Sequence, residues 1–153
     1  MGAAEVSDDI EARVLAVRQA RAEDGPDMRR VVTEQLLAGG FDAPDAERDA
    51  DLADDGYYRE PGRGAWVAVR PDGHVVGCAV LDRGDGELAL LRRLAGRGLP
   101  LLTRAAVAFA EGRAYRGIEI VLPAAMTDAR SAVSAEGFTP AGPQNDLLFR
   151  RPL

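Results

Sequence analysis

The chain has 153 residues, a length that suits one domain with a substantial buried core. Hydrophobic residues make up 46% of it, and no run of about 18 apolar residues occurs, so we expect no membrane-spanning helix. The formal net charge of −6 disfavours a general nucleic-acid-binding protein. We therefore expect neither a nucleic acid nor a membrane as a partner.

The N-terminal residues 1–11 are acidic and are predicted to be a flexible tail before a single domain over residues 12–153. They lack the apolar stretch of a secretion signal, which indicates a cytoplasmic protein. Cys78 is the only cysteine, so no internal disulfide is possible. Because it lies in an apolar run, we interpret it as a buried thiol rather than a reactive nucleophile.

The first half of the domain begins with a predicted strand at 13–20 and a helix at 23–40. Asp24 suits the cap of this helix, and Gly39 suits its end. Its apolar residues recur at helical spacing, which predicts one face packed on the core. A second helix is predicted over 42–58; it is polar and acid-rich, as in a helix that lies on the surface.

The second half has a clearer pattern of strands. Two apolar runs flank Arg70-Pro71-Asp72-Gly73, which predicts an antiparallel hairpin, and a turn at 82–86 leads to a third strand at 87–91. A helix at 101–112, a strand at 116–122, a helix at 126–138 and a last strand at 146–151 follow. This order predicts an α+β (mixed α/β) domain, with a twisted, mostly antiparallel sheet and about four helices.

The stretch RRLAGRGLP, residues 92–100, lies between the third hairpin strand and the helix at 101–112. We predict a glycine-rich turn here. Exposed backbone N–H groups in such a turn can donate hydrogen bonds to a phosphate, and the helix N-terminus adds partial positive charge. Arginines gather between positions 92 and 104. A local positive patch on an acidic protein suits a small anionic ligand better than DNA.

Three strings, in this order and spacing, resemble the GCN5-related N-acetyltransferase (GNAT) family. LAVRQARAEDGPDMRRVV resembles its opening strand and helix. DADLADDGYYREPGRGAWVAVRPDGHVVGCAVL resembles one bacterial branch, with a YYxxPG turn before a hairpin. YRGIEIVLPAAMTDARSAVSAEGF resembles the fifth strand and fourth helix, which end in glycine and phenylalanine. The resemblance covers about residues 13–151 and implies a GNAT-like domain that uses acetyl-CoA.

In that family a Q/R-x-x-G-x-G/A turn holds the pyrophosphate of acetyl-CoA. The resemblance places this turn on the residues from Arg93 to Gly98, with Gly96, Arg97, Gly98 and Leu99 as cofactor-binding residues. A second register, from Ala95 to Pro100, stays open. The resemblance further implies that backbone groups of Leu90 and Leu91 polarise the thioester. The segment between Glu87 and these glycines is shorter than is usual in the family.

The resemblance also assigns roles to three side chains. Glu87 matches a glutamate suggested as a general base that acts through water, although a solvated charge is the alternative. Tyr57 and Tyr58 resemble residues near the acceptor cleft, or else pack a helix end. The position of the family's tyrosine acid is occupied by Val133, which cannot donate a proton.

Two hypotheses for function follow. The first is an N-acetyltransferase that moves an acetyl group from acetyl-CoA to a primary amine of a small molecule or peptide. The alternative is a non-catalytic ligand-sensing or interaction module with a reduced coenzyme site. His74 and Cys78 lie on one hairpin, so no metal is expected as a cofactor. The last strand has an edge that allows a homodimer.

Overall fold

The computed structural model describes residues 14–40, 56–141 and 148–153. The tail predicted at 1–11 and most of the helix predicted at 42–58 lie outside these ranges. In chain order the elements are β1 (Ala16–Gln19), the 3-10 turn η1 (Ala22–Asp24), α2 (Gly25–Ala38), the 3-10 turn η2 (Tyr57–Arg59), β2 (Gly64–Val69), β3 (Val75–Arg83), β4 (Leu88–Gly96), α4 (Leu99–Gly112), β5 (Gly117–Val121), α5 (Thr127–Ala135), β6 (Thr139–Pro140) and β7 (Leu148–Pro152). None of the described helices is long and apolar enough to cross a bilayer.

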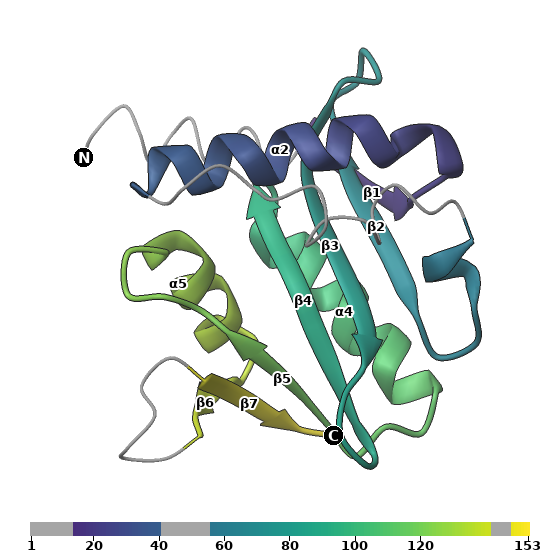
Figure 1. Ribbon diagram of the computed structural model, residues 1–153, viewed down its shortest axis with the longest axis vertical. Coiled ribbons are helices and arrows are strands. Elements are labelled where there is room, and N and C mark those ends of the chain that lie inside the picture. The colour runs from purple at the N-terminus through teal and green to yellow at the C-terminus, as the bar shows by residue number, and fades with distance from the viewer. Residues whose placement is uncertain (1–13, 41–55, 142–147) are drawn as a thin grey trace.

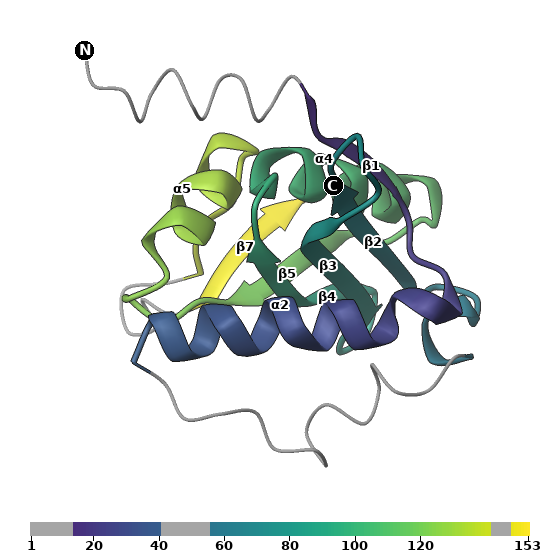
Figure 2. The ribbon, with the colours of Figure 1, turned by 90° about the horizontal axis from the view of Figure 1, so that it is seen from above.

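The strands form one seven-stranded sheet in the order β1-β2-β3-β4-β5-β7-β6 (Figure 1). Every neighbouring pair is antiparallel except β4 and β5, which run parallel. Helix α2 covers one face of the sheet, and α4 and α5 cover the other (Figure 2). The predicted mixed and mostly antiparallel sheet is therefore confirmed.

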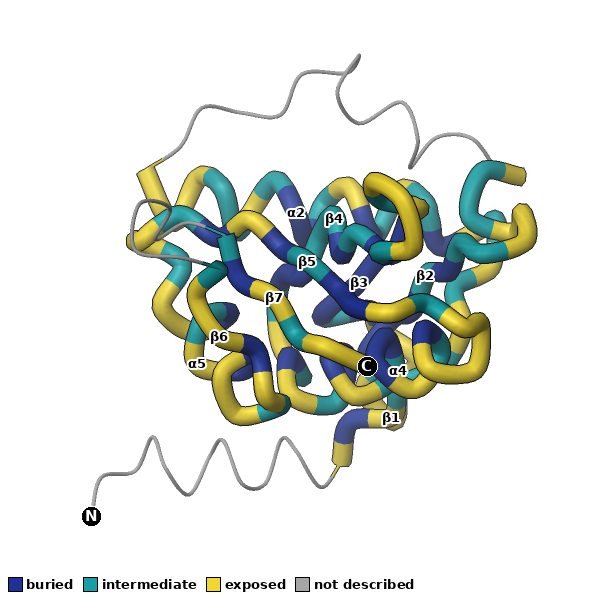
Figure 3. The backbone as a smooth tube through the Cα atoms, turned by 90° about the horizontal axis from the view of Figure 1, so that it is seen from below, coloured by how far each residue is buried: buried dark blue, intermediate teal, exposed yellow. Residues whose placement is uncertain are grey.

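Side chains alternate between the two faces along each strand, so the sheet divides the core into two clusters. The α4 and α5 side holds the larger cluster, which includes Leu81, Leu91 and Ile118. The α2 side holds Val67, Cys78 and Val80 with residues of α2. Figure 3 shows buried segments along the central strands and on the inner sides of the helices.

Cys78 is fully buried, as the sequence predicted. Burial raises the pKa of its thiol to about 12. The thiol is therefore protonated at neutral pH and has little nucleophilic character in the folded protein.

The glycine-rich stretch differs from its prediction. Residues 92–96 continue β4 rather than forming a turn, and α4 begins at Leu99, so the connection shrinks to Arg97 and Gly98. The strand continues because Leu94 and Ala95 each pack into one of the two core clusters, and because β3 supplies hydrogen-bonding partners as far as Gly77. Strand β3 is also longer than predicted and includes Asp82.

Candidate functional site: the cleft between β4 and β5

Strands β4 and β5 separate after a short parallel contact. Leu88–Leu90 pairs with Gly117–Glu119, and beyond this point the strands diverge toward α2 (Figure 1). A cleft of about 240 Å³ opens there. It is lined by Val32, Gln35 and Leu36 of α2, by Arg92, Arg93, Leu94 and Ala95 of β4, and by Ile120, Val121, Leu122, Pro123 and Met126.

A bulge in β4 shapes the charged part of this wall. Val80 pairs with Arg93 and Leu81 pairs with Leu91, so Arg92 is an extra residue in the ladder. A bulge breaks the strict alternation of side chains, and two successive arginines can then line the same cleft. The cleft therefore combines two guanidinium groups with a mainly apolar lining.

Gly96 and Gly98 lie at the end of β4 and adopt positive φ angles of 84° and 74°. The Gly96 N–H donates to Oε1 of Gln35 at 2.7 Å, and the Arg97 N–H donates to the Val76 carbonyl at 2.9 Å. A Cβ on Gly96 would lie 2.2 Å from that carbonyl oxygen. Close backbone packing therefore explains the glycine at 96, and two of the amides expected to hold phosphate are bonded within the protein.

The predicted coenzyme residues are only partly brought together. Arg93 lines the cleft, and Leu90 is the last β4 residue that pairs with β5. The backbone of Leu91 follows at the point where the strands part. Leu99 is buried, whereas Arg97 is exposed. Their roles in holding acetyl-CoA stay predictions.

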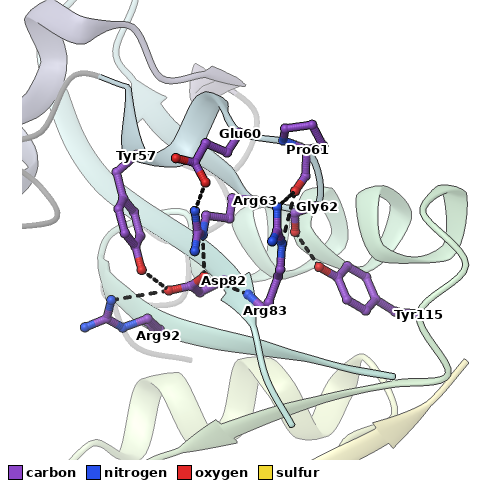
Figure 4. A network of polar contacts seen from close by, with 9 residues as sticks. All are labelled: Tyr57, Glu60, Pro61, Gly62, Arg63, Asp82, Arg83, Arg92 and Tyr115. Atoms are coloured by element: carbon purple, nitrogen blue, oxygen red, sulfur yellow. Dashed lines mark hydrogen bonds and ion pairs between the residues drawn. The ribbon is translucent and has the colours of Figure 1, made fainter. Parts of the chain in front are cut away.

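Asp82 is the centre of a polar network beside the cleft (Figure 4). Asp82 is only 7% exposed. Tyr57 donates its hydroxyl to Oδ2 at 2.5 Å, and Arg63 donates its Nε to Oδ1 at 2.7 Å. The Arg83 backbone N–H donates to Oδ1 at 2.7 Å, and the Arg92 guanidinium lies 3.5 Å from Oδ2. Because Arg92 also lines the cleft, the carboxylate helps to place a charged group in its wall.

The protonation of this network is set by burial and hydrogen bonding. Burial alone would raise the pKa of the Asp82 carboxyl, but hydrogen bonds from Tyr57, Arg63 and the Arg83 amide outweigh it, and the pKa is lowered. The hydrogen bond to Asp82 is the main cause of a raised pKa for Tyr57. At neutral pH Asp82 is thus a carboxylate and Tyr57 is a phenol.

Asp82 was predicted at the start of a turn, without a functional role. A signal was present, because this acidic residue directly follows the longest apolar run of the hairpin, VVGCAVL. Tyr57 and Tyr58 were both predicted to lie near the acceptor cleft, yet their side chains make different contacts. Tyr57 points to Asp82, whereas Tyr58 packs against the core cluster on the α2 side.

Two other predicted positions lie away from the cleft lining. Glu87 precedes β4 at the end where β4 and β5 are joined, and its carboxylate pairs with Arg116 at 2.6 Å. Its side chain is 64% exposed, and it is not among the residues that line the cleft. Val133 is buried in the core beneath α5.

Comparison with known proteins identifies the fold. No family model and no curated protein sequence matches the chain. Among solved structures, a GNAT-family acetyltransferase from Staphylococcus aureus Mu50 superposes with a TM-score of 0.77 at 15% identity, over 91% of this chain and 99% of that one. A GCN5-related N-acetyltransferase from Kribbella flavida gives 0.71 at 23% identity, over 92% and 99%.

A phosphinothricin acetyltransferase of the GNAT superfamily from Sinorhizobium meliloti, solved in complex with acetyl-CoA, also matches. It gives a TM-score of 0.71 at 19% identity, over 92% of this chain and 89% of that one. The chain therefore has the GNAT fold, and the resemblance seen in its sequence is confirmed at the level of the fold.

Proposed function

We propose that this protein is an acetyl-CoA-dependent N-acetyltransferase that acts on a primary amine of a small molecule or peptide. The observation that carries the proposal is the cleft where β4 and β5 part, with Arg92 and Arg93 in its wall. Solved proteins of the same fold are acetyltransferases, and one was solved with acetyl-CoA. These similar proteins support an acyl-transfer function. The primary amine as acceptor is proposed by analogy with proteins of the same fold.

The residues of the cleft fit such a ligand in two respects. Arg92 and Arg93 offer guanidinium groups to phosphate oxygens, and the apolar lining, with Leu94 and Ile120, suits an acyl-bearing chain. The ladder between β4 and β5 ends at Leu90, and the backbone of Leu91 at this point is proposed to polarise the thioester carbonyl. Acetyl-CoA, when bound, supplies the thioester.

The transfer forms a bond from the amine nitrogen to the acetyl carbon and breaks the bond from that carbon to sulfur. The ammonium must first lose one proton so that the neutral amine can attack. After the attack the nitrogen loses a second proton, and the departing thiolate takes up one proton to give the thiol. The described residues that line the cleft include no carboxylate, so we propose that the ammonium proton passes to water. Asp82 acts as a positioning residue through Arg92, since its carboxylate is already occupied by donors.

The test compares acetyl-CoA binding by two variants, each with a tryptophan in place of an exposed residue. Val121 lines the cleft and is 57% exposed, so Val121→Trp adds bulk in the cleft without disturbing the core. Leu153 is 36% exposed at the last residue and serves as the matched control. We expect calorimetry to show acetyl-CoA binding to the wild type and to Leu153→Trp, and at least tenfold weaker binding to Val121→Trp. Equal binding by both variants would place the ligand elsewhere.

Turnover is measured by thiol release with a panel of primary amines. Cys78 does not contribute to this signal while the protein is folded, because its thiol is buried with a pKa of about 12. We expect thiol release that depends on the amine. Release that is independent of the amine would contradict the proposed transfer.

A non-catalytic ligand-sensing or interaction module with a reduced coenzyme site is the second candidate. It is favoured by the Gly96 and Arg97 amides, which are bonded to Gln35 and to Val76, and by Val133 in place of a proton donor. This candidate predicts weak or absent acetyl-CoA binding and no thiol release with any amine. Thiol release that depends on the amine would contradict it.

A further inference from the structure

A second cavity lies at the edge of the sheet, on the side away from the cleft. Its volume is about 480 Å³, which is larger than the cleft. Its lining comes from the end of β1 and the start of α2, from η2 and the start of β2, and from the end of α4. The residues are Gln19, Ala20, Arg21, Ala22, Gly25, Met28, Tyr58, Arg59, Glu60, Pro61, Arg63, Gly64, Ala65, Phe109 and Arg113.

The strand register explains why a cavity forms here. Strand β1 ends its pairing with β2 at Gln19 opposite Trp66, and the Ala20 N–H then donates to the Ala65 carbonyl. After this bond the chain turns away into η1 and α2. The first residue of β2, Gly64, is left without β1 beside it, and the surrounding elements enclose the space at this edge.

The charge of the lining is unusual for this protein. Four arginines and a single carboxylate, Glu60, line the cavity, although the chain has a net charge of −6. Arg63 is paired with Asp82 and Glu60, and Arg21 lies 3.7 Å from Glu23.

Arg59 and Arg113 differ from these two. Within the described ranges neither has a carboxylate partner, and the Arg113 guanidinium lies 4.9 Å from the centre of the Phe109 ring. Guanidinium groups gathered around one cavity repel each other, and a bound anion would relieve this repulsion. Tyr58, Phe109 and Met28 supply apolar surface beside the charges.

We propose that this cavity binds a small organic anion whose carboxylate or phosphate group contacts Arg59 and Arg113 while its apolar body lies against Phe109 and Tyr58. The site is separate from the proposed acetyl-CoA cleft, and the proposal does not depend on acetyl transfer. The two cavities share one polar network, because Asp82 contacts Arg63 of this cavity and Arg92 of the cleft. An anion bound here is therefore positioned to affect the cleft.

Trp66 provides a direct readout of binding. It is the only tryptophan, and its ring centre lies 5.3 Å from that of Phe109. Its ring also covers Gly64 of the cavity lining. Phenyl phosphate, phenylacetate and the neutral phenylacetamide share an apolar ring and differ in charge. We expect the first two to change the emission of Trp66 and to release or absorb heat in calorimetry, with phenyl phosphate binding more tightly and phenylacetamide not binding.

Matched variants locate the site. Arg59→Gln and Arg113→Gln should each weaken phenyl phosphate binding about tenfold, the size of one charge-assisted contact. Arg70→Gln, an exposed change in the turn between β2 and β3, and Arg93→Ala, in the cleft, should leave it unchanged. Circular dichroism confirms that each variant is folded.

Several outcomes would overturn the proposal. One is binding of phenylacetamide as tight as that of phenylacetate. A second is wild-type affinity in both Arg59→Gln and Arg113→Gln. A third is loss of binding in Arg93→Ala, which would place the anion in the cleft. Absence of an emission change and of heat for all three probes up to millimolar concentration would also refute it. Acetyl-CoA binding is measured independently with Val121→Trp, so the two proposals can fail separately.

Discussion

The two ends of β4 are held in different ways. At Leu88–Leu90 the strand has hydrogen-bonded neighbours on both sides, with β3 antiparallel and β5 parallel. Beyond Leu90 the ladder of β4 is with β3 alone, and residues 92–95 line the cleft. The same strand is thus an interior strand at its start and an edge strand at its end.

This difference shows how the cleft is made without loosening the sheet. At the open end the Gly96 N–H donates to Gln35 of α2, and the Arg97 N–H donates to the Val76 carbonyl of β3. Gly77 of β3 and the Arg97 carbonyl also approach each other closely. We therefore expect sensitivity to mutation to fall from the open end, through Asp82, to the joined end at Glu87.

The largest effect is expected for Gly77→Ala. A Cβ at this position would lie 2.0 Å from the Arg97 carbonyl oxygen, which belongs to the backbone and has no rotamer that relieves the clash. The end of β4 would have to move away from β3. We expect a loss of about 3 kcal/mol or more in the free energy of unfolding, measured by urea denaturation.

Gly112→Ala is the control for this substitution. No atom lies within 4 Å of a Cβ built at Gly112, and it ends α4 without a positive φ. Alanine there should leave stability unchanged or raise it slightly. If Gly77→Ala unfolds at the same urea concentration as the wild type, close approach does not hold the open end.

The middle of the strand pair depends on Asp82, which faces Leu90 across the ladder. Asp82→Asn removes the charge from hydrogen bonds with Tyr57 and Arg63, and we expect a loss of about 2 kcal/mol at neutral pH. The pKa of the Asp82 carboxyl is lowered in the folded state. Its stabilisation is therefore present above the unfolded pKa of about 3.9 and is lost as the pH falls through the lower folded value.

The difference between the wild type and Asp82→Asn should accordingly shrink below about pH 4 in urea denaturation. Asp85→Asn, an exposed change in the same hairpin, should alter stability by less than about 0.5 kcal/mol at any pH. A difference for Asp82→Asn that is constant from neutral pH to acid would show that the charge of the carboxylate contributes nothing.

The architecture was predictable because its signals are local. The turn at Arg70-Pro71-Asp72-Gly73 and the apolar spacing of α2 lie within short windows, and the structure confirms both elements. The prediction of a turn at the end of β4 was wrong for a physical reason. Two glycines and three arginines resemble a turn in isolation, but β3 and α2 supply partners for that stretch from distant parts of the chain.

The candidate site was less predictable, because its contacts join residues far apart in sequence. Tyr57 and Asp82 are 25 positions apart, and Gln35 and Gly96 are 61 apart. The second cavity is harder still to predict, since its lining comes from several elements that are far apart in sequence, and no short window contains its charge pattern. Arg93, by contrast, was named through the family resemblance, and it does line the cleft.

The smallest effect is expected at the joined end of β4. Glu87 and Arg116 form an ion pair whose side chains are 64% and 79% exposed, and water and salt screen such pairs strongly. Glu87→Gln should change the free energy of unfolding by no more than about 0.5 kcal/mol. Thiol release should also stay at the wild-type rate, because Glu87 is outside the cleft lining.

Arg116→Gln is the control if Glu87→Gln does slow thiol release. If Glu87→Gln slows thiol release while Arg116→Gln does not, the carboxylate acts on the reaction through water, as the sequence suggested. If both slow it equally, the ion pair holds the joint between β4 and β5 from which the cleft opens.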